Sequence, residues 1–101
     1  MAEDRERTSA DGRAAEGRRV APLAEAVRQR RRELGLRQAE VADLAGCSER
    51  FVHTVEHGKA SLRLDKILDV LAVLGLGLVV APGHGRVGVA TEPTPGSGEG
   101  R

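Results

Sequence analysis

The chain has 101 residues, with 16 Lys and Arg against 15 Asp and Glu, and this near-neutral balance excludes nucleic-acid binding through bulk positive charge. One Phe and no Trp or Tyr exclude single-strand binding by base stacking. A single cysteine, Cys47, excludes a disulfide scaffold and is typical of a reducing cytoplasm. No apolar run approaches the roughly 20 residues that span a bilayer, and residues 1–19 contain no apolar stretch of a secretory signal.

Composition divides the chain into three parts. Residues 1–20 are mostly Ala, Arg, Glu, Asp and Gly, a mixture that buries too little apolar surface to offset its ordering entropy. We therefore predict a disordered N-terminal tail over 1–20. Residues 81–101 are rich in Gly and Pro and predict a flexible C-terminal tail. Within that tail, Val87 and Val89 leave open whether it orders on a partner or docks on the body. The folded domain is predicted over 21–80.

Four helical segments are predicted in the domain. Apolar residues recur at helical spacing in each segment, most clearly at Leu64, Ile67, Leu68, Leu71 and Leu74. Each segment is followed by a glycine, which favours the left-handed conformation that ends a helix: Gly35, Gly46, Gly58 and Gly75. Ser48 and Ser61 are suitable N-caps for the third and fourth segments, and Pro22 suits the first turn of the first.

After Gly75 the apolar period changes from helical to two. Leu76, Leu78 and Val80 alternate with Gly77 and Val79, a pattern that predicts a short β-strand. A lone strand leaves its backbone N–H and C=O groups unpaired, and no second strand is evident in the domain. We therefore predict that this strand pairs with its copy in a two-fold homodimer.

The second and third segments are joined by a very short turn at Gly46–Cys47, the arrangement of a helix-turn-helix. Ala42 is small enough for two helices to cross closely, and Val52 and Val55 give the third segment an apolar face. These offsets predict that the two helices pack as one unit.

This stretch resembles the Cro/repressor, or XRE-type, helix-turn-helix family. The resemblance is carried by Gln38–Ala42, Ala45–Ser48, Val52, Val55–Lys59, Ser61–Leu62 and Ile67–Leu68. It implies an all-α, lambda-repressor-like four-helix DNA-binding domain with the added C-terminal strand. Through the strand, the chain resembles the HipB-like branch, which comprises antitoxins that repress their own operon and bind a kinase toxin. The implied partners are double-stranded DNA with a palindromic operator, a second copy and a HipA-like kinase, and the implied location is the cytoplasmic nucleoid.

In this family the third helix enters the major groove with its N-terminal residues at base edges. Glu49, Arg50 and Thr54 project from its outer face, opposite the two valines. Arg50 suits a bidentate contact to guanine, Glu49 suits cytosine N4, and Thr54 suits a base edge or a thymine methyl. Phe51 lies part-way round the helix, and packing against the domain or contact with a thymine methyl both remain open for it.

Phosphate contacts are assigned to a second group of residues. The resemblance implies them for Gln38, which opens the second helix, and for Lys59 after the Gly58 turn; Ser48 and His53 are further candidates. Arg37 departs from the family's usual Ser or Thr cap, so half of a capping box with Glu40 is missing. We expect Arg37 to contact phosphate instead. Residues 18–37 hold seven Arg against two Glu, a net charge of +5, which fits either phosphate contacts or a solvated helix face.

Other chemistry is disfavoured. His53 and His57 have a spacing that can bind zinc, but no third ligand is evident, and Cys47 has no neighbouring base. The glycines match no phosphate-binding loop. We therefore expect no cofactor, no metal and no enzymatic activity. Two functions remain: a DNA-binding repressor, which is either an antitoxin or a stand-alone XRE-type regulator, and a mainly toxin-binding antitoxin with incidental DNA binding.

Overall fold

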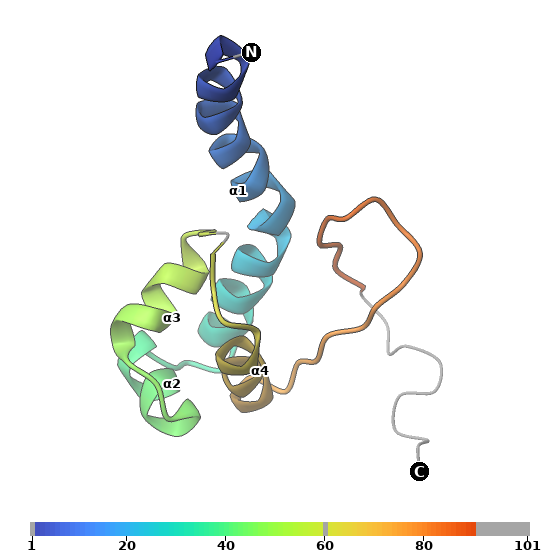
Figure 1. The fold of residues 1–101 in the computed structure, drawn as a ribbon. Coiled ribbons are helices and arrows are strands. Elements are labelled where there is room, and N and C mark those ends of the chain that lie inside the picture. Colours follow the sequence, from blue (N-terminus) through green and yellow to red (C-terminus); the bar gives the residue numbers. More distant parts are fainter. Residues whose placement is uncertain (1, 60, 91–101) are drawn as a thin grey trace.

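A computed structural model describes residues 2–59 and 61–90 of the chain, with side chains from residue 17 onward. Four helices follow one another: α1 (Ala2–Glu33), α2 (Gln38–Ala45), α3 (Glu49–Glu56) and α4 (Leu64–Val73). Helix α2 packs against α3 and α4, and α3 packs against α1, whose N-terminal half projects beyond the other helices (Figure 1). The described residues confirm the predicted four-helix, all-α domain.

All four predicted glycine stops are confirmed. Gly35, Gly46, Gly58 and Gly75 have φ values of 71°, 74°, 73° and 73°, in the left-handed region that favours glycine. At the end of α4, Leu76 N–H donates to the Leu71 carbonyl at 2.9 Å, and Gly75 N–H donates to the Ala72 carbonyl at 3.2 Å. This pair of bonds is a Schellman motif, which satisfies carbonyls that the helix leaves without partners.

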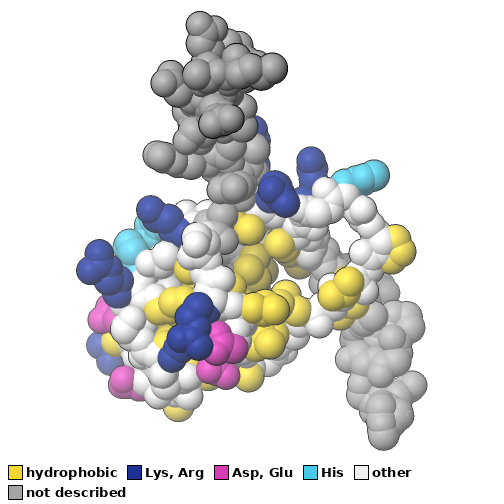
Figure 2. Space-filling model, in the orientation of Figure 1, with side chains coloured by type: hydrophobic (Ala, Val, Ile, Leu, Met, Phe, Trp, Pro, Cys, Tyr) yellow, Lys and Arg dark blue, Asp and Glu magenta, His cyan; other side chains and the backbone are white. Residues whose placement is uncertain are grey.

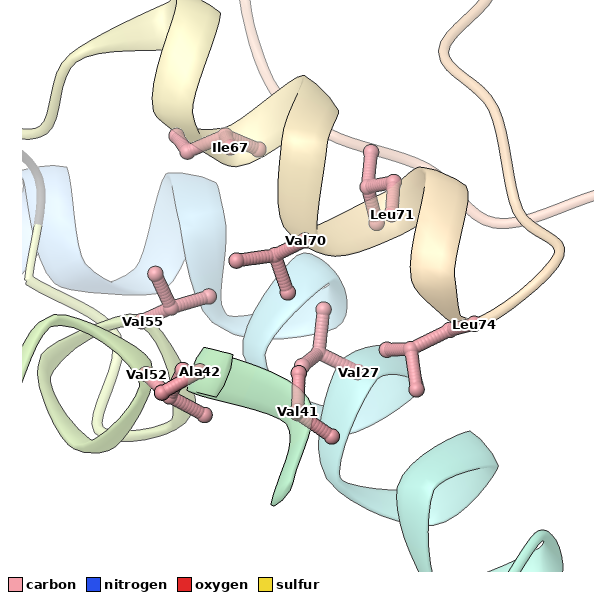
Figure 3. Packing of buried hydrophobic residues seen from close by; sticks show 9 residues of the cluster. All are labelled: Val27, Val41, Ala42, Val52, Val55, Ile67, Val70, Leu71 and Leu74. Carbon is pink, nitrogen blue, oxygen red and sulfur yellow. The ribbon is translucent and has the colours of Figure 1, made fainter. Parts of the chain in front are cut away.

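One apolar core receives side chains from every helix. Val27 of α1 meets valines of α2 and α3 and the buried face of α4 (Figure 3). Its other members are Val41, Ala42, Val52, Val55, Ile67, Val70, Leu71 and Leu74. Several leucines of the predicted stripes lie outside this core and are exposed: Leu34, Leu44, Leu64 and Leu68. The β-branched residues of the short helices therefore form the centre of the domain.

The N-terminal segment differs from the prediction. Residues 2–20, predicted as a disordered tail, belong to α1, and Pro22 lies inside the helix and not in its first turn. Ala, Arg and Glu, which dominate this segment, are strong helix formers. The segment also continues a helix that the packed residues after it have already nucleated, so extension avoids the cost of a new nucleus.

The start of α4 also differs from the prediction. The N-cap is Arg63, whose side chain makes no capping bond, and Ser61 is not the cap. Asp65 supplies the missing acceptor in the first turn: its Oδ1 accepts from Lys66 N–H at 2.8 Å, and its Oδ2 lies 2.7 Å from Arg63 Nη2. The ion pair and hydrogen bonds lower the pKa of Asp65.

The chain after α4 is irregular through residue 90, and no strand is found in residues 2–59 and 61–90. The predicted strand at Leu76, Leu78 and Val80 needs a second copy as its partner and stays a prediction. Leu76 packs against the core, whereas Val80 is 99% exposed. Within the predicted flexible tail, residues 81–90 are described and residues 91–101 lie outside the described part.

Residues 81–90 dock on α1. Val87 N–H donates to the Arg19 carbonyl at 2.9 Å, and Arg19 Nε donates to the Gly85 carbonyl at 2.9 Å. Val87 is half-buried, while Val89 is exposed. Of the two alternatives for this segment, the structure has it docked on the body through Val87. Among the described residues, no helix is both long and apolar enough to cross a bilayer.

Candidate DNA-binding interface

The turn between α2 and α3 sets the geometry of the site. Gly46 adopts φ 74°, ψ 34°, and a Cβ built there would meet no atom within 4 Å, so its backbone conformation and not crowding calls for glycine. Cys47 N–H donates to the Ala42 carbonyl at 3.0 Å. Ser48 then begins α3, its hydroxyl accepting from Phe51 N–H at 3.0 Å, which confirms the predicted cap.

Helix α3 separates a buried face from an exposed one. Val52 and Val55 are buried in the core, and Phe51 packs against it, which favours the packing alternative for this side chain. Glu49 and Arg50 are exposed on the opposite face. Thr54 is half-buried, and its hydroxyl donates to the Arg50 carbonyl at 2.8 Å, so its methyl and oxygen lone pairs are what it can offer to a base.

A buried carboxylate holds α3 against α1 and α2. Glu56 is 2% exposed, and its two oxygens accept from Arg31 Nε at 2.6 Å and Arg31 Nη2 at 2.9 Å. Gln38 Nε2, at the start of α2, donates to the same carboxylate at 3.1 Å. This cluster of Arg31, Gln38 and Glu56 joins three helices, and the bidentate geometry is the form in which a buried ion pair is best satisfied.

The charge state of Glu56 follows from these contacts. Burial by itself would raise the pKa of this carboxyl, but hydrogen bonds from Arg31 and Gln38 and the charges of Arg31 and Arg28 outweigh it. The pKa of Glu56 therefore lies below its ordinary value, and the hydrogen bond to Glu56 raises the pKa of Arg31. Glu56 stays ionised at neutral pH.

Three arginines of the predicted basic strip bind carbonyls within the domain. Arg28 Nη1 donates to the Glu56 carbonyl at the end of α3 at 3.1 Å, and Arg30 Nε donates to the Leu74 carbonyl at the end of α4 at 3.0 Å. Arg31 Nη1 donates to the Leu36 carbonyl at 3.0 Å. Helix C-termini leave carbonyls without partners and favour cations. These arginines therefore link α1 to its neighbours, which neither alternative for the strip anticipated.

The predicted phosphate-binding residues differ in how accessible their side chains are. Lys59 and His53 are exposed, as is Arg37, but the Gln38 amide is engaged by Glu56. At the start of α2, the Glu40 carboxylate accepts from Arg37 N–H at 2.7 Å, and this bond lowers its pKa. The Arg37 side chain makes no capping hydrogen bond, as expected, because a guanidinium has no acceptor.

Sequence reasoning missed the role of Glu56. The signal was present: Glu56 follows Val52 by four residues and Val55 by one, which places a carboxylate on the apolar face of α3. A charge on a buried face needs a partner, and Arg31 lies on the buried side of α1, four residues after Val27.

Comparison with known proteins agrees with this geometry. The profile of a helix-turn-helix domain family matches residues 22–81. The chain belongs to this helix-turn-helix family. It is also similar to y4mF, an uncharacterised HTH-type transcriptional regulator of Sinorhizobium fredii (strain NBRC 101917 / NGR234). The two are 43% identical over 61 residues, which cover 59% of this chain and 80% of the relative. The helix-turn-helix domain thus includes α2–α4 and the packed half of α1.

Replacing Glu56 with Gln is expected to lower the free energy of unfolding by about 3 kcal/mol at neutral pH, because it leaves the Arg31 charge without its partner. The same change at Glu33, which pairs with Arg30 across an exposed 3.4 Å contact, is the matched control and is expected to cost less than about 1 kcal/mol. Urea unfolding followed by circular dichroism measures both. Equal losses would show that the buried pair contributes no more than the exposed one.

The same variant has a pH signature. A carboxyl whose pKa is lowered by folding contributes stability above its unfolded pKa of about 4.3, and loses that contribution as the pH falls through the folded pKa. The wild-type protein is therefore expected to lose stability below about pH 4.3 more steeply than Glu56→Gln.

Proposed function

We propose that this protein is a sequence-specific regulator of transcription that binds double-stranded DNA and acts as a repressor, without enzymatic activity. The observation that carries the proposal is the orientation of α3: its outer face exposes Glu49 and Arg50, while Glu56 anchors its inner face. An α-helix of this kind fits the major groove, where base edges carry a distinct pattern of donors and acceptors. The regulator named among the similar proteins supports the same function.

The side chains of α3 then divide into two roles. Arg50 reads guanine, Glu49 accepts from cytosine N4, and Thr54 contacts a base edge or a thymine methyl. Lys59, Arg37, Ser48 and the start of α2 at Gln38 lie against phosphates and set the register of the helix in the groove. Because Gln38 also holds Glu56, a phosphate contact there would link backbone binding directly to the orientation of α3.

Replacing both Arg50 and Thr54 with Ala is expected to abolish recognition of the operator, since each good base contact contributes about 1–3 kcal/mol of discrimination. Fluorescence anisotropy on a labelled duplex from the protein's own promoter, against a scrambled duplex, measures the ratio of specific to non-specific affinity. Arg32→Ala, which removes an exposed arginine of α1, is the control. If both variants weaken binding equally, general charge and not base reading accounts for the affinity.

The proposal includes a two-fold homodimer. Leu76, Leu78 and Val80 form its strand, which pairs with the same strand of the second copy. Support comes from the apolar side chains that follow α4 and face solvent: Leu78 is 44% exposed, Val79 61% and Val80 99%. Such a dimer would set two recognition helices about 34 Å apart, which matches the half-sites of a palindromic operator one DNA turn apart.

Replacing Leu78 with Pro is expected to produce monomers in analytical ultracentrifugation, because proline removes a ladder donor. Leu78→Ala keeps the main-chain N–H and is expected to retain more of the dimer. A Leu78→Pro protein that stays fully dimeric would place the interface elsewhere.

The finer proposal is a HipB-like antitoxin that represses its own operon and binds a HipA-like kinase toxin. It rests on the HipB-like resemblance, which is carried mostly by the segment Leu74–Leu78 after α4. The alternatives are a stand-alone XRE-type regulator and a mainly toxin-binding antitoxin with incidental DNA binding.

Co-expression with the product of the neighbouring gene, followed by pull-down, separates these functions. An antitoxin is expected to capture a HipA-like kinase, and the Arg50→Ala, Thr54→Ala variant is expected to capture it equally well while losing the promoter in a gel shift. Promoter binding without any kinase would identify a stand-alone regulator. Capture of the kinase by a protein that fails to bind its promoter would make DNA binding incidental.

A further inference from the structure

Two histidines form a stacked pair on the exposed face of α3. The rings of His53 and His57 have centroids 3.9 Å apart with their planes 30° apart, and both residues are exposed. They are one helical turn from each other, and His53 is three residues after Arg50, so all three share the face opposite Val52 and Val55. Histidine side chains lie beside Lys and Arg side chains over α3 (Figure 2). The pair therefore belongs to the surface that faces DNA in the proposed function.

The orientation of the His57 ring is fixed by a hydrogen bond. Its Nδ1 lies 2.8 Å from the His53 carbonyl oxygen, and a carbonyl only accepts, so Nδ1 carries a proton. The neutral ring then has its bare nitrogen at Nε2. Protonation at Nε2 turns an acceptor, which repels a phosphate oxygen, into a charged donor, which binds one.

The charged residues around His53 and His57 come from α3, the turn after it, α1 and α2. On α3 and the turn after it these residues are Glu49, Arg50, Lys59 and the buried Glu56. From α1, Arg28 is paired with Glu25 at 3.3 Å and binds the Glu56 carbonyl.

Further charged residues on the helices packed against α3 are Arg31 and the exposed Arg32 of α1, and Glu40 and Asp43 of α2. Arg31 forms an ion pair with the Glu56 carboxylate. From α2, Glu40 is paired with Arg37 at 3.4 Å, and Asp43 is exposed. Lys59 and Arg50 are exposed on the same surface, and their positive charges favour an anion there.

We propose that His53 and His57 form a proton-dependent site for a DNA phosphate on α3, with His57 Nε2 as the atom that takes up the proton. The inference rests on the proposed DNA-binding function and adds a residue, His57, that reads the backbone only in its charged form. Because imidazole titrates between pH 5 and 8, DNA affinity rises as the pH falls across the physiological range. The interaction adds to the phosphate charges that the protein neutralises, so salt dependence steepens at low pH.

The experiment measures the affinity of the full-length chain for a labelled 30-base-pair promoter duplex, and for a scrambled duplex of the same length, at pH 6 and pH 8 over a series of salt concentrations. The wild-type protein is expected to bind both duplexes about tenfold more tightly at pH 6, the effect of one charge-assisted hydrogen bond. Its salt slope is expected to steepen by about 0.9 for each additional phosphate that the protein neutralises.

Three variants test whether His53 and His57 cause the pH dependence of DNA affinity. His53→Gln with His57→Gln is expected to remove the pH dependence, while His84→Gln, in the exposed loop after α4, is expected to keep it. His57→Lys carries a permanent charge and is expected to bind at pH 8 as tightly as the wild-type protein does at pH 6. Circular dichroism and unfolding curves at both pH values confirm that each variant is folded.

Two results would overturn this inference and leave the proposed DNA-binding function intact. One is promoter binding by the wild-type protein with equal affinity at pH 6 and pH 8, and the other is an unchanged pH dependence in the double Gln variant. Failure to bind either duplex at any pH would instead overturn the proposed function, and this inference with it.

Discussion

The ion pair between Arg31 and Glu56 is the contact on which the orientation of α3 depends. A carboxylate buried to this extent is costly to desolvate, and the two Arg31 bonds, the Gln38 amide and the charge of Arg28 offset that cost. Arg31, Gln38 and Glu56 each come from a different helix. The pair is satisfied only when α1, α2 and α3 are together in one arrangement, so it selects that arrangement among the looser packings that a small valine-rich core would tolerate.

The arginines near this ion pair hold helices together in a domain with little apolar surface. Arg28 and Arg30 bind the C-terminal carbonyls of α3 and α4, where the helix dipole and the unpartnered carbonyls both favour a cation. They are therefore engaged in structure, although their sequence resembles a DNA-binding strip. The exposed positive charges proposed for phosphate contacts lie instead at Arg50 and Lys59, on α3 and the turn after it, and at Arg37 before α2.

The described chain extends beyond the family domain in both directions, and Arg19 joins the two extensions. The match to the family covers residues 22–81, whereas Arg19 binds Gly85 and Val87. This contact fastens the segment after α4 to α1, on the opposite side of α1 from α3 (Figure 1). The exposed face of α3 is therefore left uncovered by this segment.

Local features of this protein were determined by sequence alone. Glycines at 35, 46, 58 and 75 end the four helices because only the left-handed conformation closes them there, and Ser48 caps α3 because its hydroxyl reaches the N–H of Phe51. The exposure of Glu49 and Arg50 followed from the helical period of the buried valines.

Only the tertiary structure decided which polar groups meet. Arg31 and Glu56 are 25 residues apart. Helical spacing from Val27 places Arg31 on the buried side of α1, but only the packing of α1 against α3 decides that it meets Glu56. Residues 2–20 contain strong helix formers, but they are helical because they extend a helix that packed residues further along α1 nucleate. The docking of Val87 on Arg19 likewise joins segments 68 residues apart, and such contacts depend on how the helices pack and not on the order of their residues.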